Sequence, residues 1–153
     1  MKKPALGLLD IHIVVNAKTR LAKCFVAGGE LRWTVPVLAE GLSRDTEAWG
    51  GDTPEGLWEV TAAEKIPRTD PDADAFGWWF LYLLCHEAIK RAAVGIGWHG
   101  GGSDAPDPWA ARQDLGHTLG CLRSFNEDLD KKIVPSVLYT LKRGGRVWLS
   151  VVR

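Results

Sequence analysis

The chain has 153 residues, 46% of them hydrophobic, so it is long enough to bury a core and too apolar for a disordered chain. Nineteen lysine and arginine residues balance nineteen aspartate and glutamate residues, which leaves no excess of positive charge to attract nucleic acid or an anionic membrane. We expect one domain over residues 1–153, with no nucleic acid among its partners.

The N-terminal segment lacks the pattern of a signal peptide. Asp10 and His12 interrupt its apolar run, and no small-residue cleavage site follows. The longest apolar stretches, near residues 77–85 and 147–152, are far shorter than the ~20 residues that span a bilayer. Three widely spaced cysteines cannot all pair, so at least one thiol is expected to be free, as in a reducing compartment. These features predict no membrane span and a cytoplasmic location, or delivery by a route without a signal peptide.

Short β-strands are predicted for the N-terminal part of the chain. Residues 10–41 carry β-branched residues in short runs cut by NAKTR and AGGE, which predicts three strands in a meander. Pro54 and Gly56 have the spacing of a turn, and a fourth strand is expected to begin at Leu57. The polar, proline-containing segment 66–77 predicts an exposed loop.

Residues 78–98 fit either a helix or a strand. Apolar residues at Leu84, Ala88 and Ala92 have helical spacing, whereas the run up to Leu83 suits a strand equally well. The stretch VGIGW at its end predicts a strand, and the glycine-rich segment 100–114 predicts a loop.

The C-terminal part predicts one helix and one strand. Asn126 is the expected N-cap of a helix with acidic residues in its first turn and a glycine pair at its end. Pro135 is expected to bend or split this helix, because proline removes an internal hydrogen bond. Residues 146–152 predict a closing strand. The fold class we expect is a mainly β, sandwich-like domain with a C-terminal helix.

Cys121 has three possible roles. It could be a small core residue, as free cysteines often are, although the turn residues before it and Arg123 after it argue against full burial. It could bind zinc with His99 and His117, but Gly120 disfavours the helix that would bring His117 and Cys121 to one face. It could be a nucleophile activated by a histidine, for which His99 and His117 are the candidates. His117 is nearer in sequence, but catalytic partners normally meet through the fold, and His99, at the end of a predicted strand, has the position of a catalytic base.

The stretch GIGWHGGG, followed about twenty residues later by HTLGCLRS, resembles the signature of the L,D-transpeptidase catalytic domain (YkuD) family. That signature is a histidine–glycine pair and then serine or threonine, any residue, glycine, cysteine, any residue, and arginine or asparagine. The segment GDTPEGLWEV is similar to another part of the family pattern, and the resemblance spans residues 11–151. It implies a β-sandwich-like catalytic domain that needs no cofactor or metal.

The resemblance also implies roles for the residues of the motif. Cys121 would be the nucleophile and His99 the general base, with the carbonyl of Gly100 holding the imidazole in its working tautomer. The backbone N–H groups of Gly120 and Cys121 would stabilise the oxyanion of a tetrahedral intermediate.

Four further residues are candidates for binding substrate. Thr118 stands at the serine or threonine position of the motif. Arg123 would shape the floor of the pocket or bind a substrate carboxylate; a solvated surface charge is the alternative. Tyr82 is a candidate to reach the pocket, and His117 is a candidate for an additional hydrogen-bond donor or is simply a surface residue.

Two departures from the family pattern concern substrate preference. Leu119 stands where many members have a histidine, and the loop between Gly100 and His117 is long for the motif.

The function that the resemblance implies is cysteine-dependent acyl transfer on peptidoglycan stem peptides or muropeptides. The enzyme would cleave the diaminopimelate to D-alanine bond through a thioester, as a carboxypeptidase or transpeptidase. The alternative is a non-catalytic peptidoglycan-binding module on the same fold.

Overall fold

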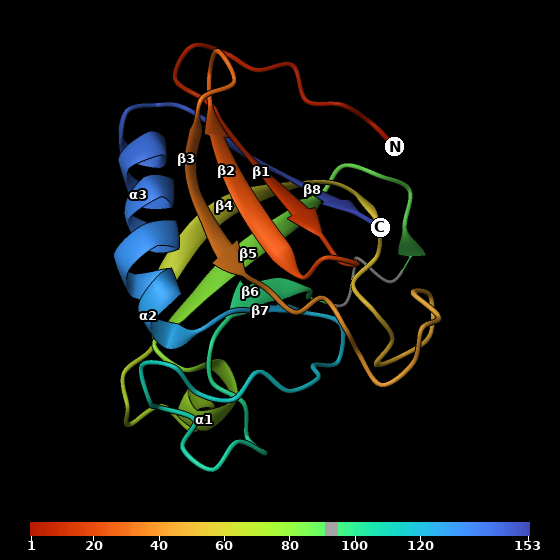
Figure 1. Ribbon diagram of the computed structural model, residues 1–153, viewed down its shortest axis with the longest axis vertical. Coiled ribbons are helices and arrows are strands. Elements are labelled where there is room, and N and C mark those ends of the chain that lie inside the picture. Colours follow the sequence, from red (N-terminus) through yellow and green to blue (C-terminus); the bar gives the residue numbers. More distant parts are fainter. Residues whose placement is uncertain (91–94) are drawn as a thin grey trace.

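The N-terminal residues form the predicted meander. The structure is a computed structural model that describes residues 1–90 and 95–153. Its first three strands are β1 (Ile11–Asn16), β2 (Leu21–Val26) and β3 (Leu31–Pro36), paired antiparallel in that order (Figure 1). Alternate residues of β1, among them Ile13 and Val15, are fully buried, as expected for a sheet with one face on the core.

Eight strands in the described part of the chain make one hydrogen-bonded sheet in the order β3-β2-β1-β8-β4-β5-β6-β7. The predicted closing strand, β8, lies at its centre, parallel to β1 and antiparallel to β4. The remaining strands are β4 (Gly56–Lys65), β5 (Trp79–Cys85), β6 (Gly97–His99), β7 (Leu122–Arg123) and β8 (Val147–Val152). The sheet is curled, so that β1–β3 lie in front of β4–β6 (Figure 1).

The ambiguous segment resolves into strands. Residues 79–85 form β5, because they pair with β4 along most of its length, and residues 97–99 form β6 as predicted. Ala92, which belongs to the helical spacing, and Val94, which begins the stretch predicted as a strand, lie outside the described residues. Two loop predictions were wrong in part: segment 66–77 contains the short helix α1 (Ala73–Phe76), and residues 52–55 form an irregular connection instead of a turn.

The C-terminal helical segment is continuous from Asn126 to Lys142, so the expected split at Pro135 is not observed. It consists of α2 (Asn126–Asp128), the π-helical turn η2 (Leu129–Ile133) and α3 (Val134–Lys142), which has Pro135 in its first turn. The prediction for Asn126 was wrong: Phe125 is the N-cap and Asn126 is the first helical residue, because its amide group makes tertiary contacts instead.

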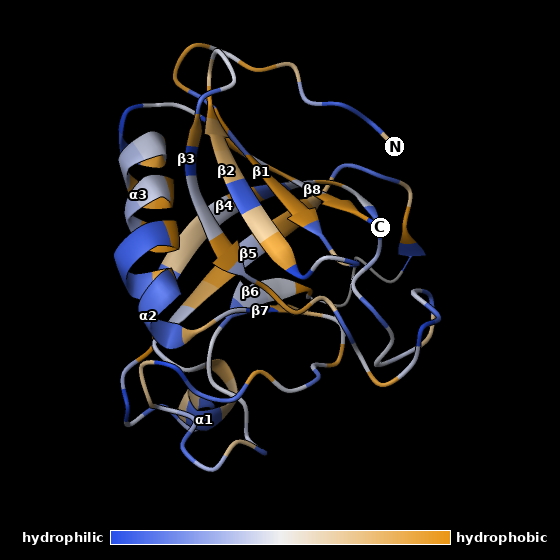
Figure 2. Ribbon diagram, viewed as in Figure 1, coloured by the Kyte–Doolittle hydropathy of each residue, from blue (hydrophilic) through white to orange (hydrophobic). Residues whose placement is uncertain are grey.

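A single core lies between the two halves of the curled sheet and the helix. Figure 2 shows hydrophobic residues along the strands and on the side of α3 that faces the sheet, and Val134 and Val137 of α3 are buried there. The two outer edges of the sheet meet, because Leu38 and Arg123 exchange backbone hydrogen bonds of 2.8 and 2.9 Å. The expected mainly β, sandwich-like fold with a C-terminal helix is therefore confirmed. No helix in the described part of the chain has the length and apolar character needed to cross a membrane.

Candidate active site

His99, Cys121 and Arg123 come together on two neighbouring strands. His99 is the last residue of β6, and it pairs with Arg123 of the parallel strand β7. Cys121 precedes β7 directly, and its Sγ accepts a hydrogen bond of 3.3 Å from the N–H of Gly97 at the start of β6. Residues two apart on a strand point to the same face, so this pairing brings the three side chains to one face of the sheet.

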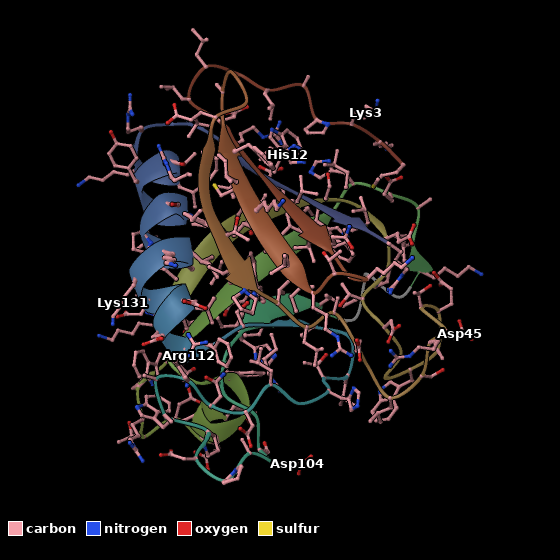
Figure 3. The ribbon with its side chains drawn as sticks, in the orientation of Figure 1. Lys3, His12, Asp45, Asp104, Arg112 and Lys131 are labelled. Atoms are coloured by element: carbon pink, nitrogen blue, oxygen red, sulfur yellow. The ribbon has the colours of Figure 1, made fainter. Side chains whose placement is uncertain are left out.

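The same three side chains line one pocket of about 730 Å³. Gly102, Asp104 and Ala105 of the loop after β6 line it as well, and so do Leu42 and Leu119. Figure 3 labels Asp104 on the loop after β6 and Asp45 on the loop that contains Leu42. The long loop after His99 therefore forms part of the cleft above Cys121.

His99 is held as a neutral imidazole. It is only 3% exposed, and burial, together with the charge of Arg123 and against the effect of the Gly100 carbonyl, lowers its pKa to about 4. Its Nδ1 lies 2.8 Å from the carbonyl oxygen of Gly100. Because a carbonyl can only accept, Nδ1 carries the proton and Nε2 is left as the basic nitrogen.

Two phenylalanines fix the plane of this imidazole. Phe80 of β5 stacks on His99 at 5.7 Å between ring centroids, and Phe76 of α1 meets it edge-on at 5.0 Å. The sequence analysis missed both residues. Phe80 can be identified from the sequence only if residues 79–85 are known to form a strand beside β6, because Phe80 is then the residue opposite His99.

Arg123 is a buried cation at the pocket, so the interpretation as a solvated surface charge was wrong. Its side chain is 7% exposed, and Nη1 donates hydrogen bonds of 2.9 Å to the carbonyl oxygens of Gly116 and His117. Nε is buried and has no hydrogen-bond partner among the described residues. Burial lowers the pKa of the guanidinium, while attraction to Cys121 and Asp104 acts in the opposite direction.

The turn before Cys121 is tied by threonine side chains. Thr118 Oγ1 donates to the Cys121 carbonyl at 2.7 Å and accepts from the Gly120 N–H at 3.0 Å. Thr53 Oγ1 donates to the Gly120 carbonyl at 2.7 Å. The prediction that the Gly120 N–H is an oxyanion donor therefore conflicts with the structure, since this N–H is already bonded to Thr118. Thr53 belongs to the GDTPEG segment, which resembles the family pattern, but the sequence does not predict this contact of its side chain.

His117 and Tyr82 differ in their relation to the pocket. His117 lines it, with its exposed imidazole 4.0 Å from a carboxylate oxygen of Glu40, so this side chain lies at the mouth. Tyr82 is absent from the described lining of the pocket. It is 45% exposed and its hydroxyl donates to Glu64. The structure thus does not place Tyr82 in the pocket: its hydroxyl is bonded to Glu64 of the neighbouring strand β4 instead.

The remaining cysteines and the tryptophans do not line this pocket, but Trp49 lines a second, neighbouring pocket together with Leu119 and Cys121. Cys24 is fully buried in β2, and burial raises the pKa of its thiol to about 11. The described lining of the pocket beside His99 contains neither Cys85 nor any tryptophan. Within residues 1–90 and 95–153, no three histidine, cysteine or acidic side chains are close enough to hold a metal ion, and His99, His117 and Cys121 do not form the zinc site that was considered.

Comparison with protein families identifies the same family as the sequence motif. The L,D-transpeptidase catalytic domain family, YkuD, matches residues 10–132. This match covers most of the chain, including the strands and the turn that carry His99 and Cys121. The protein belongs to the L,D-transpeptidase catalytic domain family. Comparison with curated protein sequences gives no match.

Solved structures share the fold at low sequence identity. The helical cell shape determining protein Pgp2 of Campylobacter jejuni has a TM-score of 0.58 and 15% identity, over 92% of this chain and 46% of that chain. Bd1075 of Bdellovibrio bacteriovorus gives 0.57 and 15%, with the same coverage. An L,D-transpeptidase of Stackebrandtia nassauensis gives 0.51 and 13%, over 94% and 55%. The chain spans about half the length of these proteins, and the likeness establishes the fold.

Proposed function

We propose that this protein is a cysteine acyltransferase that acts on peptidoglycan stem peptides, with Cys121 as nucleophile and His99 as general base. The observation that carries the proposal is the orientation of His99. A buried imidazole with its Nδ1 proton directed to the Gly100 carbonyl presents Nε2 as a base in the pocket that it shares with Cys121. Membership of the L,D-transpeptidase catalytic domain family supports peptidoglycan stem peptides as the class of substrate.

In the first step Nε2 of His99 takes the thiol proton, and the sulfur attacks the carbonyl carbon between diaminopimelate and D-alanine. The tetrahedral intermediate then collapses, the C–N bond breaks, and the imidazolium returns its proton to the amine of the leaving D-alanine. The product on the enzyme is a thioester on Cys121. In the second step water or an amine attacks the thioester, and His99 again carries the proton.

Electrostatic stabilisation would come from the Cys121 N–H and from Arg123. The Cys121 N–H would be the oxyanion donor, because the N–H of Gly120 is bonded to Thr118. Arg123 is a cation at the pocket, and its planar group suits a carboxylate of the stem peptide. Release to water gives carboxypeptidase activity, and release to a second stem peptide gives a cross-link.

The direct test is incubation of the purified protein with a tetrapeptide muropeptide, followed by measurement of free D-alanine. Release without an amine acceptor is expected for hydrolysis, and formation of cross-linked dimer alone would identify a transpeptidase. Cys121→Ala and His99→Gln should abolish both products, whereas Cys85→Ala should not. Failure of the wild-type protein to form either product, or full activity of Cys121→Ala, would contradict the proposal.

A second candidate is a peptidoglycan-binding module without activity. Leu119 favours it, because this leucine is 54% exposed beside Cys121 in the pocket lining, where many family members carry a histidine. Intact-protein mass spectrometry after incubation with a carbapenem separates the two candidates. The enzyme should form an adduct that is lost in Cys121→Ala, while a binding module should form none and still sediment with peptidoglycan.

A further inference from the structure

The peptide group that orients His99 is itself held from its other side. Gly100 and Gly101 share one planar trans peptide, so the carbonyl of Gly100 and the N–H of Gly101 point in opposite directions. The carbonyl accepts from His99 Nδ1 at 2.8 Å, and the N–H donates to Oδ1 of Asn126 at 3.1 Å. Asn126 therefore contacts the group that fixes the histidine without contacting the histidine.

Asn126 is rigidly placed by its own contacts. Its side chain is fully buried. Its Nδ2 donates to the carbonyl oxygens of Pro108 and Ala110 at 2.9 and 2.7 Å, and its backbone N–H donates to Oε1 of Gln113 at 2.9 Å. This network joins the start of α2 to the long loop after β6, so the carboxamide cannot turn without breaking buried hydrogen bonds.

Asn126 holds the N–H of this peptide group, whereas other hydrogen bonds hold its neighbours: the Gly100 N–H donates to Phe76, the Gly102 N–H donates to Asp74, and Gln113 donates to the Gly101 carbonyl. Both residues of the peptide group are glycine, and Gly101 has a φ of +62°, a region that glycine leaves easily because it lacks a Cβ. Rotation of the peptide plane would direct the Gly100 carbonyl away from His99, so that the Nδ1 proton would lose the acceptor 2.8 Å away. The close approach also explains the glycines: a Cβ on Gly77 or Gly100 would collide with Oδ1 of Asn126.

We infer that Asn126 is a positioning residue that holds the Gly100–Gly101 peptide and thereby keeps His99 in the Nδ1-protonated tautomer. The other tautomer would present an N–H to the cysteine instead of a lone pair, and Nε2 would no longer accept the thiol proton. Asn126 touches neither substrate nor the thiol in this role. The consequence for catalysis rests on the proposed function, whereas the tautomer itself can be measured directly.

The test compares the wild type with Asn126→Ala, which removes the acceptor of the Gly101 N–H. Ser136→Ala is the matched control, because it removes a buried side-chain hydrogen bond of 2.9 Å to Trp33 from α3, remote from His99. The ring nitrogens of His99 are observed by ¹⁵N NMR at pH 7, and the alkylation rate of Cys121 is measured with iodoacetamide.

Wild type and Ser136→Ala should show Nδ1–H, while Asn126→Ala should shift to Nε2–H and alkylate about tenfold more slowly or worse. An unchanged tautomer in Asn126→Ala, or an equal shift in Ser136→Ala, would overturn the inference. If Asn126→Ala does not fold, hydrogen exchange of the Gly101 amide in the wild-type protein decides: strong protection supports the contact, and exchange at the rate of an open loop overturns it. A wild-type protein that passes these tests yet releases no D-alanine would refute the proposed function alone.

Discussion

The buried neutral histidine should make stability depend on pH in a window where carboxylates contribute little. The pKa of His99 is about 4 in the folded protein against an ordinary value of 6.5. As the pH falls below 6.5 the unfolded chain binds a proton at this position and the folded protein does not, so the free energy of unfolding decreases. The whole shift corresponds to about 3 kcal/mol, of which about 2 kcal/mol is lost between pH 7 and pH 5.

The assay is urea unfolding followed by tryptophan fluorescence at pH 7 and pH 5, for the wild type and for His99→Gln. The difference between the two proteins removes the contribution of other groups, including His12, whose pKa is also lowered by burial. The wild type should lose about 2 kcal/mol more than the variant over this interval. A wild type that gains stability relative to His99→Gln at pH 5 would mean that His99 is protonated in the folded protein, as in a resting thiolate–imidazolium pair, and would refute the assignment of a neutral base.

Three further predictions concern the residues around the site. Thr53→Val should lower the free energy of unfolding by about 1–3 kcal/mol in urea titrations, because the buried Gly120 carbonyl loses its donor; an unchanged midpoint would contradict this role. Tyr82→Phe should leave the rate of carbapenem acylation within about twofold of wild type, since only the exposed hydrogen bond to Glu64 is lost. A much larger decrease in that rate would mean that Tyr82 takes part in the reaction. Cys24 should react with iodoacetamide only after unfolding, because it is buried and its pKa is about 11; peptide mapping of the native protein would reveal early labelling if this were wrong.

The strands could be predicted where one pattern of burial acts along a short segment. The alternation in residues 11–36 and the apolar closing strand follow from local sequence, and so does the position of His99 at a strand end. Residues 79–85 could not be assigned in this way, because the choice of strand over helix depends on pairing with β4, more than ten residues away along the chain.

The chemistry of the site was predictable in its residue types but not in its contacts. The motif identified Cys121, His99 and Gly100, whereas the burial of Arg123 and the occupied N–H of Gly120 depend on how segment 116–120 folds over β7. Asn126 shows the same limit. Its residue type and position before a helical pattern suit an N-cap, and the local signal failed because a network of tertiary hydrogen bonds competes for the same carboxamide.

The location of the site follows from how the sheet closes. Arg123 is bonded through its backbone to Leu38, which joins the two edges of the sheet, and the next residue donates its N–H to the carbonyl of His99 at 3.1 Å. The side chain of Arg123 holds the carbonyls of Gly116 and His117 from the same point. A change that opens the Leu38–Arg123 bridge would therefore displace the cysteine turn and the histidine strand together. Precise placement of the nucleophile and base is thus inseparable from the closure of the fold, which explains why two strands as short as β6 and β7 can carry the site.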